Sequence, residues 1–155
     1  LLKLLGERVP INSMRGYSLT LPAHAQAPMV SVTDMKNKIV YANLGSHIRI
    51  AGFMDANQKQ GNIDKRTAQL LETAKVSWPG IADYDAEPHA WSGCRPMVPG
   101  GVPVIRQSRV PGLYLNLGHG SLGLTLAAGS AAKLTDCLAQ TTNLNLTEGQ
   151  ETYAT

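Results

Sequence analysis

The chain has 155 residues, 43% of them apolar and 16% charged, which is ordinary for a globular protein and enough for one domain with a buried core. Its 14 Lys and Arg residues are scattered and the net charge is only +3, so the sequence gives little support for nucleic-acid binding. No apolar run approaches the ~18 residues that span a membrane, and no signal peptide opens the chain. We therefore expect a cytoplasmic protein, with peripheral attachment to the inner face of the membrane as the alternative.

The residues that most often bind metals do not form a recognisable set. Cys94 and Cys137 lack the spacing of a metal site or of a redox pair, so we interpret them as reduced thiols. Asp83, Asp85 and Glu87 share a loop but do not have a calcium-binding spacing. We therefore expect no metal site.

The first half of the chain has the pattern of an antiparallel sheet. Apolar and polar residues alternate over Arg15–Leu21, which predicts a strand, and Met29–Thr33 predicts a second, shorter one. Lys38–Asn43 and His47–Phe53 read as a hairpin. Four such strands in succession favour a sheet with one covered face.

The hairpin indicates which side chains lie on the covered face. Four apolar side chains share it: Ile39, Tyr41, Ile48 and Ile50. His47 and Arg49 fall on the opposite face, where we interpret them as solvated groups or cross-strand partners.

A helix and a returning strand follow. Asp64 is a plausible N-cap, apolar residues recur at helical spacing as far as Trp78, and Pro79 ends the helix. The strand His89–Arg95 then returns to the sheet and delivers Arg95.

The C-terminal part reads as a strand, a glycine turn and a helix. Leu113–Leu117 is a short apolar strand, and Gly118, Gly120 and Gly123 supply positive φ or close backbone approach. Helical spacing begins at about Leu122. Free N–H groups at such a helix start favour a partly negative ligand, and a turn that binds nothing is the alternative.

The two ends of the chain carry less pattern. Residues 141–155 are polar, and we expect this tail to be partly disordered. The first residue is Leu1 rather than Met, which suggests a piece of a longer polypeptide. No Gly-x-Gly-x-x-Gly fingerprint of a dinucleotide-binding unit lies near the start.

Several motifs together resemble the C-terminal end of D-amino-acid dehydrogenases, flavoenzymes of the D-amino-acid oxidase and glycine oxidase superfamily. The resemblance covers about residues 8 to 140, and it rests on these segments: Arg15-Gly-Tyr-Ser, Trp91-x-Gly-x-Arg95-Pro96, Pro103-Val-Ile, Gly112-Leu-Tyr-Leu-Asn and Gly118-His-Gly-x-Leu-Gly-x-Thr125.

The resemblance implies an α+β fold in two parts. Residues 1–110 would form the antiparallel substrate-binding sheet with one covering helix. Residues 111–140 would be the last strand, turn and helix of an FAD-binding domain, and 141–155 a polar tail. The N-terminal dinucleotide-binding part of that domain would be absent from this chain and would be its main partner.

The resemblance also implies a reaction and its site. Family members oxidatively deaminate D-amino acids to 2-oxo acids and ammonia by hydride transfer to FAD. Arg95 matches the arginine that pairs with the substrate carboxylate, a task that suits the planar guanidinium. The flavin edge would be contacted by the following residues: Gly118, His119, Gly120, Gly123, Leu124 and Thr125. We assign no catalytic side chain.

Alternatives remain for these assignments. Arg95 could be a surface arginine that ends a strand, and Thr125 an ordinary helix cap. We expect the chain alone to be inactive and not to retain FAD, and a homodimer could form through its exposed strand edge. The alternative function is a non-catalytic α+β module or relic of the family that acts as an interaction domain. Two departures from the family pattern, Val98-Pro99-Gly100-Gly101 and Arg106, put the carried-over specificity in doubt.

Overall fold

The computed structural model describes residues 2–56 and 63–151, which form two compact units. One unit spans Ser13–Arg95, and the other combines Leu1–Asn12 with Pro96–Thr155. The boundary between the two units lies at Arg95/Pro96, and the segment before β1 packs with the later part of the chain.

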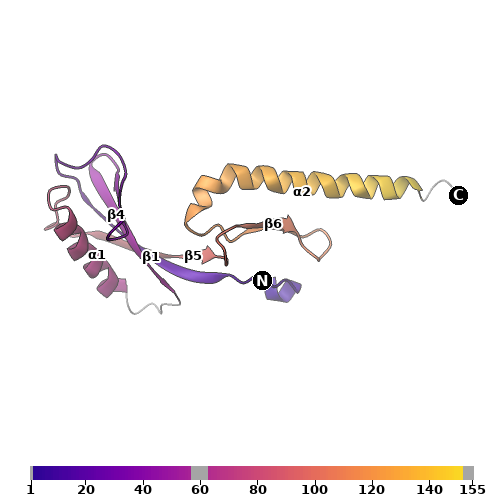
Figure 1. The fold of residues 1–155 in the computed structure, drawn as a ribbon, viewed down its shortest axis with the longest axis horizontal. Coiled ribbons are helices and arrows are strands. Elements are labelled where there is room, and N and C mark those ends of the chain that lie inside the picture. Colours follow the sequence, from indigo (N-terminus) through magenta and orange to yellow (C-terminus); the bar gives the residue numbers. More distant parts are fainter. Residues whose placement is uncertain (1, 57–62, 152–155) are drawn as a thin grey trace. The chain divides into compact units, whose positions relative to one another are not determined.

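A five-stranded sheet forms most of the Ser13–Arg95 unit (Figure 1). Its strands in spatial order are β2 (Val32–Asp34), β3 (Ile39–Asn43), β4 (His47–Ala56), β1 (Asn12–Pro22) and β5 (His89–Met97). The pairs β2–β3, β3–β4 and β4–β1 are antiparallel. The predicted strands are therefore present, although the predicted strand Met29–Thr33 begins only at Val32.

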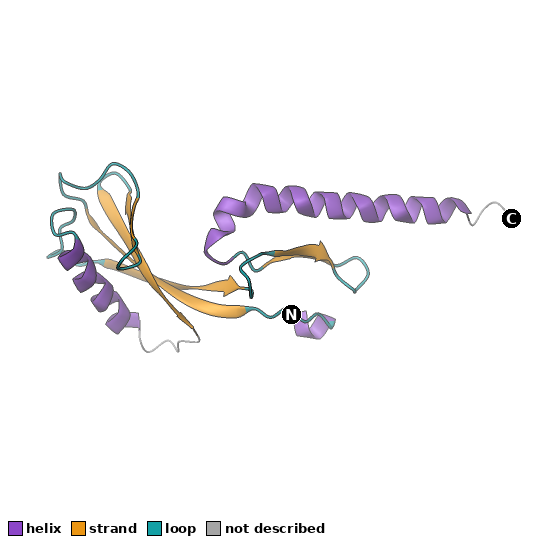
Figure 2. Cartoon of the chain, viewed as in Figure 1, coloured by secondary structure: helices purple, strands orange, loops and turns teal. Residues whose placement is uncertain are grey.

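One face of this sheet carries the core. Helix α1 (Ile63–Ser77) covers that face and buries Leu70 and Ala74 in it (Figure 2). The alternation predicted for the hairpin is confirmed, since Ile39, Tyr41, Ile48 and Ile50 have at most 1% of their surface exposed. The helix begins at Ile63, so Asp64 lies inside its first turn and is not the N-cap that the sequence suggested. In the first turn, the negative charge of Asp64 still interacts favourably with the helix dipole.

The second unit is a hairpin covered by a long helix. Strands β6 (Val104–Gln107) and β7 (Tyr114–Leu117) pair antiparallel, and a short 3₁₀ turn, η3 (Gly120–Leu122), leads into α2 (Gly123–Glu151). Helix α2 packs against both strands. The tail expected to be disordered is thus helical as far as Glu151, because a helix once nucleated propagates at low cost and no proline interrupts residues 141–151.

A buried carboxylate fixes the segment before β1, which includes η1 (Leu2–Leu5), to the β6–β7 hairpin. Glu7 is only 5% exposed and accepts hydrogen bonds from the Ser108 hydroxyl, the Arg109 backbone N–H and, at 3.1 Å, Arg106 Nη2. These donors, Ser108 first, lower the pKa of Glu7 to about 2. Arg106, which departs from the family pattern, therefore has an ionic partner in this chain.

Candidate functional site

Arg95 and Gly16 lie against each other on neighbouring strands of the sheet. A Cβ atom added at Gly16 would lie 2.9 Å from Cζ of Arg95 and about as close to both of its terminal nitrogens. Glycine is the only residue that leaves this space, so the guanidinium rests directly on the β1 backbone. The register of β1 against β4 shifts between Gly16 and Tyr17, which places this contact at a β-bulge.

The Arg95 guanidinium has no hydrogen bond or ion pair with any residue that the structure describes. The residue is half-buried. A half-buried guanidinium has five N–H donors and a permanent charge, so an anionic group from outside can satisfy it. The sequence identified Arg95 through a motif, but Gly16 only as a neighbour in a matching segment.

A hollow of about 290 Å³ opens beside Arg95 on the sheet, within the Ser13–Arg95 unit. Its other lining residues come from β1, β4 and β5 and are Tyr17, Ser18, Arg49, Ala51, His89 and Trp91. Trp91 is 56% exposed, and its indole occupies the space that a Cβ at Gly93 would need. The hollow therefore combines a large aromatic wall with two arginines, on the scale of a small-molecule site.

A network behind the hollow fixes Tyr17. Its hydroxyl donates to Asp55 Oδ2 at 3.0 Å, and Arg66 Nε donates to the same oxygen at 2.6 Å. Arg66 also stacks over Phe53, with its Cζ atom 4.8 Å from the ring centroid. The Arg66 hydrogen bonds lower the pKa of Asp55, whereas burial is the main cause that raises the pKa of Tyr17. Tyr17 is thus held in the core, with 1% of its surface exposed, and supports the hollow from behind.

The three glycines of the turn before α2 differ in their backbone φ and in the space available for a Cβ atom. Gly118 and Gly120 have φ values of 82° and 56°, and a Cβ at either would collide with the side chain of Val98 or Met97 respectively. Gly123 has a helical φ of −53° and open space for a Cβ, so the expectation that it needs positive φ or close approach is wrong.

Among the other residues around the turn, His119 is held by a hydrogen bond, whereas Leu124 and Thr125 are exposed to solvent. His119 Nε2 lies 2.8 Å from the Ser130 hydroxyl, which holds the ring on the first turns of α2. Leu124 is 94% exposed, and Thr125 is exposed as well. These residues and the first N–H groups of α2 form an exposed helix start that fits a partly negative edge of a cofactor. They belong to the second unit, whereas Arg95 belongs to the first.

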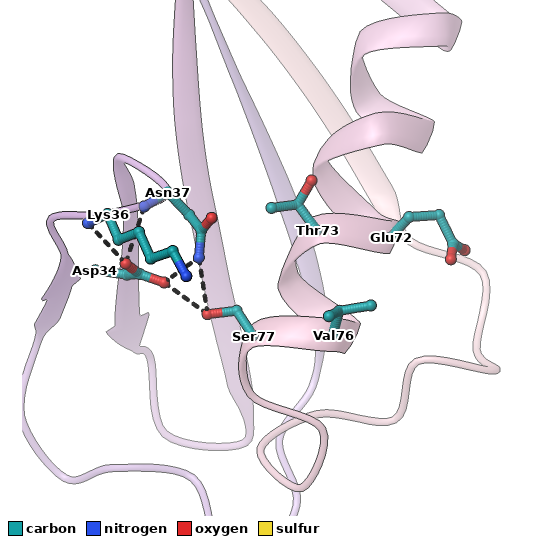
Figure 3. A pocket seen from close by; sticks show the side chains of 7 residues that line it. All are labelled: Asp34, Lys36, Asn37, Glu72, Thr73, Val76 and Ser77. Carbon is teal, nitrogen blue, oxygen red and sulfur yellow. Dashed lines mark hydrogen bonds between the residues drawn. The ribbon is translucent and has the colours of Figure 1, made fainter.

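A second hollow, of about 650 Å³, lies where the β2–β3 turn meets the end of α1 (Figure 3). Two carboxylates, Asp34 and Glu72, line it. Asp34 accepts hydrogen bonds from the Ser77 hydroxyl at 2.6 Å, the Asn37 amide at 2.7 Å and the backbone N–H groups of Lys36 and Asn37. Ser77 contributes most to lowering the pKa of Asp34 to about 2. Because these partners are internal, the cluster joins the turn to α1 and is a weaker candidate for a ligand site.

The described residues contain neither a metal-binding cluster nor a membrane-spanning helix. No group of three or more His, Cys, Asp or Glu side chains in residues 2–56 and 63–151 is placed to bind a metal ion. Along the same residues, no helix is both long enough and apolar enough to cross a bilayer.

Comparison with known proteins places the chain in a class of flavoenzymes. Residues 1–137 match the family of FAD dependent oxidoreductases named DAO, and the chain belongs to that family.

Curated relatives of the chain are named as D-amino acid dehydrogenases. D-amino acid dehydrogenase 2 of Pseudomonas aeruginosa is 44% identical over 138 residues, which cover 87% of this chain and 33% of the relative. D-amino acid dehydrogenase 2 of Ralstonia nicotianae is 42% identical over 137 residues, covering 82% of this chain and 32% of the relative. The chain thus spans about a third of the length of these relatives.

The fold is also found among solved structures. Glycine oxidase from Geobacillus kaustophilus superposes with a TM-score of 0.68 at 19% identity, over 90% of this chain and 38% of that protein. Iminodiacetate oxidase from Chelativorans sp. superposes with a TM-score of 0.65 at 19% identity, over 90% of this chain and 39% of that protein. At these identities the likeness concerns the fold alone.

Proposed function

We propose that the protein to which this chain belongs is an FAD-dependent dehydrogenase that oxidatively deaminates D-amino acids. The substrate loses a hydride from its α-carbon and a proton from its amino group, and the resulting imino acid adds water to give a 2-oxo acid and ammonia. FAD, when bound, accepts the hydride. The observation that carries the proposal is the unpartnered guanidinium of Arg95 on Gly16, in a chain that belongs to this family.

In this proposal Arg95 binds the α-carboxylate of the substrate. A guanidinium pairs with a carboxylate through two parallel hydrogen bonds, which fix the orientation of the substrate as well as its position. Gly16 supports the guanidinium from below and Tyr17 closes one wall of the hollow. A substrate held by its carboxylate presents its α-carbon in one orientation, which hydride transfer requires.

The turn before α2 is the part of the chain that we assign to the cofactor. Gly118, His119 and Gly120 shape the turn, and Gly123, Leu124 and Thr125 begin the helix. The N–H groups and dipole at this helix start favour the negative charge that reduced flavin carries on its pyrimidine edge. We further propose that the Ser13–Arg95 unit is the core of a substrate domain and that β7 and α2 belong to an FAD-binding domain completed by another segment.

The test is steady-state kinetics of the FAD-loaded protein with D-alanine and an artificial electron acceptor. Arg95→Ala should lower kcat/KM at least about tenfold, because a charge-assisted pair contributes on the order of 1.5–3 kcal/mol. Arg95→Lys keeps the charge but loses the bidentate geometry, so it should restore only part of the activity. Arg109→Ala, which removes an exposed arginine of the other unit, is the matched control. Unchanged kinetics in Arg95→Ala would exclude the carboxylate role.

The alternative, a non-catalytic relic of the family, makes a different prediction. Degeneration would leave Arg106 as an unmatched charge, but Arg106 is paired with the buried Glu7. This matched pair favours a chain that is maintained for function. A protein that binds FAD but turns over no D-amino acid would favour the alternative.

A further inference from the structure

The hollow that contains Arg95 holds a second arginine that the proposed function does not use. Arg49 on β4 is exposed, and its Nε atom donates to the Thr20 hydroxyl at 3.3 Å. It forms no ion pair with any carboxylate in the part of the chain that the structure describes. A neutral hydroxyl at this distance leaves the charge of Arg49 available to a ligand.

Both arginines reach over the same strand. The Arg95 guanidinium rests on Gly16, and Arg49 contacts Thr20 four residues further along β1. At ~3.3 Å per residue these two points lie on the order of 13 Å apart. A guanidinium–carboxylate hydrogen bond takes up about 2.8 Å at each end. The remaining length, about 7 Å, leaves room for a ligand that carries a negative group at each end.

The charge around the hollow favours a doubly negative ligand. Its lining includes Arg49, Arg95 and His89, and neither Asp nor Glu is among the described residues that line it. Two acidic side chains lie close by: Asp55, which accepts from Tyr17 and is paired with Arg66, and Glu87, which lines an adjoining hollow together with Arg49. No ion pair between Glu87 and Arg49 occurs among the described residues. A positively charged hollow concentrates anions of matching shape.

We infer that this hollow selects D-amino acids with an acidic side chain, with Arg95 binding the α-carboxylate and Arg49 the side-chain carboxylate. D-glutamate is the member of this class that the experiment uses. The inference rests on the proposed function, since it takes over the assignment of Arg95 and adds Arg49 as a specificity-determining residue.

The experiment measures binding to the 155-residue chain through the fluorescence of Trp91, which lines the hollow. D-glutamate and D-alanine are titrated at constant ionic strength, and Trp91→Phe shows which part of the signal comes from this residue rather than from Trp78. We expect D-glutamate to bind on the order of tenfold more tightly than D-alanine, as one additional charge-assisted pair would give. Circular dichroism verifies that each variant is folded.

Variants of Arg49 and Arg95 test how each arginine contributes to the preference for D-glutamate over D-alanine. Arg49→Gln should lower the ratio of D-glutamate to D-alanine affinity about tenfold, and Arg49→Lys should recover part of that ratio. Arg95→Gln should weaken both ligands. Arg109→Gln, outside the hollow, is the matched control.

The possible outcomes separate the two proposals. Equal affinity for the two ligands, with both weakened by Arg95→Gln, would overturn the acidic selectivity and leave the proposed function standing. A preference for D-glutamate that survives Arg49→Gln would also overturn the role of Arg49. If neither ligand bound in a way that depends on Arg95, the inference would fail, whereas the proposed function is decided by the kinetics of Arg95→Ala in the FAD-loaded protein.

Discussion

Gly16 lies under Arg95 so closely that a single methyl group would displace the guanidinium. The Cβ position at Gly16 is 2.9 Å from Arg95 Cζ, below any normal carbon–carbon contact, and Gly16 itself does not have positive φ. The backbone of residue 16 would therefore accept alanine, and the far end of the Arg95 side chain would have to move. Gly16 thus sets the position of the guanidinium that we propose as the carboxylate-binding group.

Gly16→Ala should weaken D-amino acid binding while leaving the fold intact. Displacing a bidentate partner costs roughly tenfold or more in affinity, whereas a half-buried guanidinium without an internal partner can move at little cost in stability. Titration of the Trp91 signal measures the first effect, and urea denaturation measures the second.

The matched control for this variant is Gly129→Ala in helix α2. No atom lies within 4 Å of a Cβ at Gly129. This variant should gain about 0.5–1 kcal/mol in stability, because glycine is unfavourable inside a helix, and should bind ligand normally. A large loss of stability in Gly16→Ala, with unchanged ligand affinity, would show that Gly16 serves the fold and not Arg95.

The Asp34 cluster offers a test by titration. The Ser77 hydroxyl is the main cause of the low pKa of Asp34, ahead of the Asn37 backbone N–H (Figure 3). Ser77→Ala should therefore raise the pKa of Asp34 from about 2 toward its ordinary value. Carboxyl chemical shifts followed by NMR against pH would measure this.

Thr73→Ala is the control for that titration. Thr73 lines the same hollow, but its hydroxyl donates to the Gln69 carbonyl oxygen and not to Asp34. The pKa of Asp34 should not change in this variant. If Ser77→Ala also left the pKa at about 2, the backbone donors of the turn would be sufficient by themselves.

The buried Glu7 should make the stability of the second unit depend on pH. Its pKa is lowered from 4.5 to about 2, so the folded state favours the ionised form. A group with a lowered pKa contributes its stability above the unfolded-state pKa and loses it as the pH falls through the folded-state pKa. We therefore expect the stability to decline from about pH 4.5 toward pH 2.

Glu7→Gln isolates this contribution. The neutral amide cannot accept from Arg106, Ser108 and the Arg109 N–H as a carboxylate does, so the variant should be less stable than the parent chain at pH 7. The difference should shrink as the pH approaches 2. Thermal unfolding of both proteins across this range is the measurement, and a difference that stays constant with pH would show that the charge of Glu7 is not responsible.

The sequence predicts this fold best where one local pattern decides the structure. Alternation over Arg15–Leu21 and helical spacing up to Trp78 correspond to β1 and α1, because each pattern reflects burial of one face. The contacts of Glu7 with Ser108 and of Arg95 with Gly16 join residues about 80–100 positions apart. No local pattern encodes such distances, so the buried ion pair was not anticipated, and the role of Gly16 required the strand order of the sheet.

The candidate site could likewise be predicted from the sequence only in part. A family motif singled out Arg95, but the register of β4 was needed to bring Arg49 into the same hollow. From the sequence alone, Arg49 could be placed on the face opposite the core and interpreted as a cross-strand partner. Its hydrogen bond to Thr20 agrees with that interpretation, while the lining of the hollow adds a second use that strand alternation could not reveal.

The last prediction is that the 155-residue chain by itself does not retain flavin. Much of the affinity for FAD comes from its pyrophosphate and ribose, which such folds usually hold in a glycine-rich turn between a parallel strand and a helix. Gly118, Gly120 and Gly123 have the Gly-x-Gly-x-x-Gly spacing of such a turn. However, β7 pairs antiparallel with β6. The side chains of Val98 and Met97 also occupy the space beside the first two glycines.

What remains for the cofactor in this chain is one helix start. An exposed helix terminus contributes about 0.3–1 kcal/mol, far below the ~8 kcal/mol that micromolar affinity requires. We therefore expect colourless protein that turns over no D-amino acid after incubation with FAD and gel filtration, measured by absorbance in the flavin band and by acceptor-dye reduction. A yellow fraction that keeps its flavin would show that residues assigned here to sheet and hairpin contain a complete cofactor site.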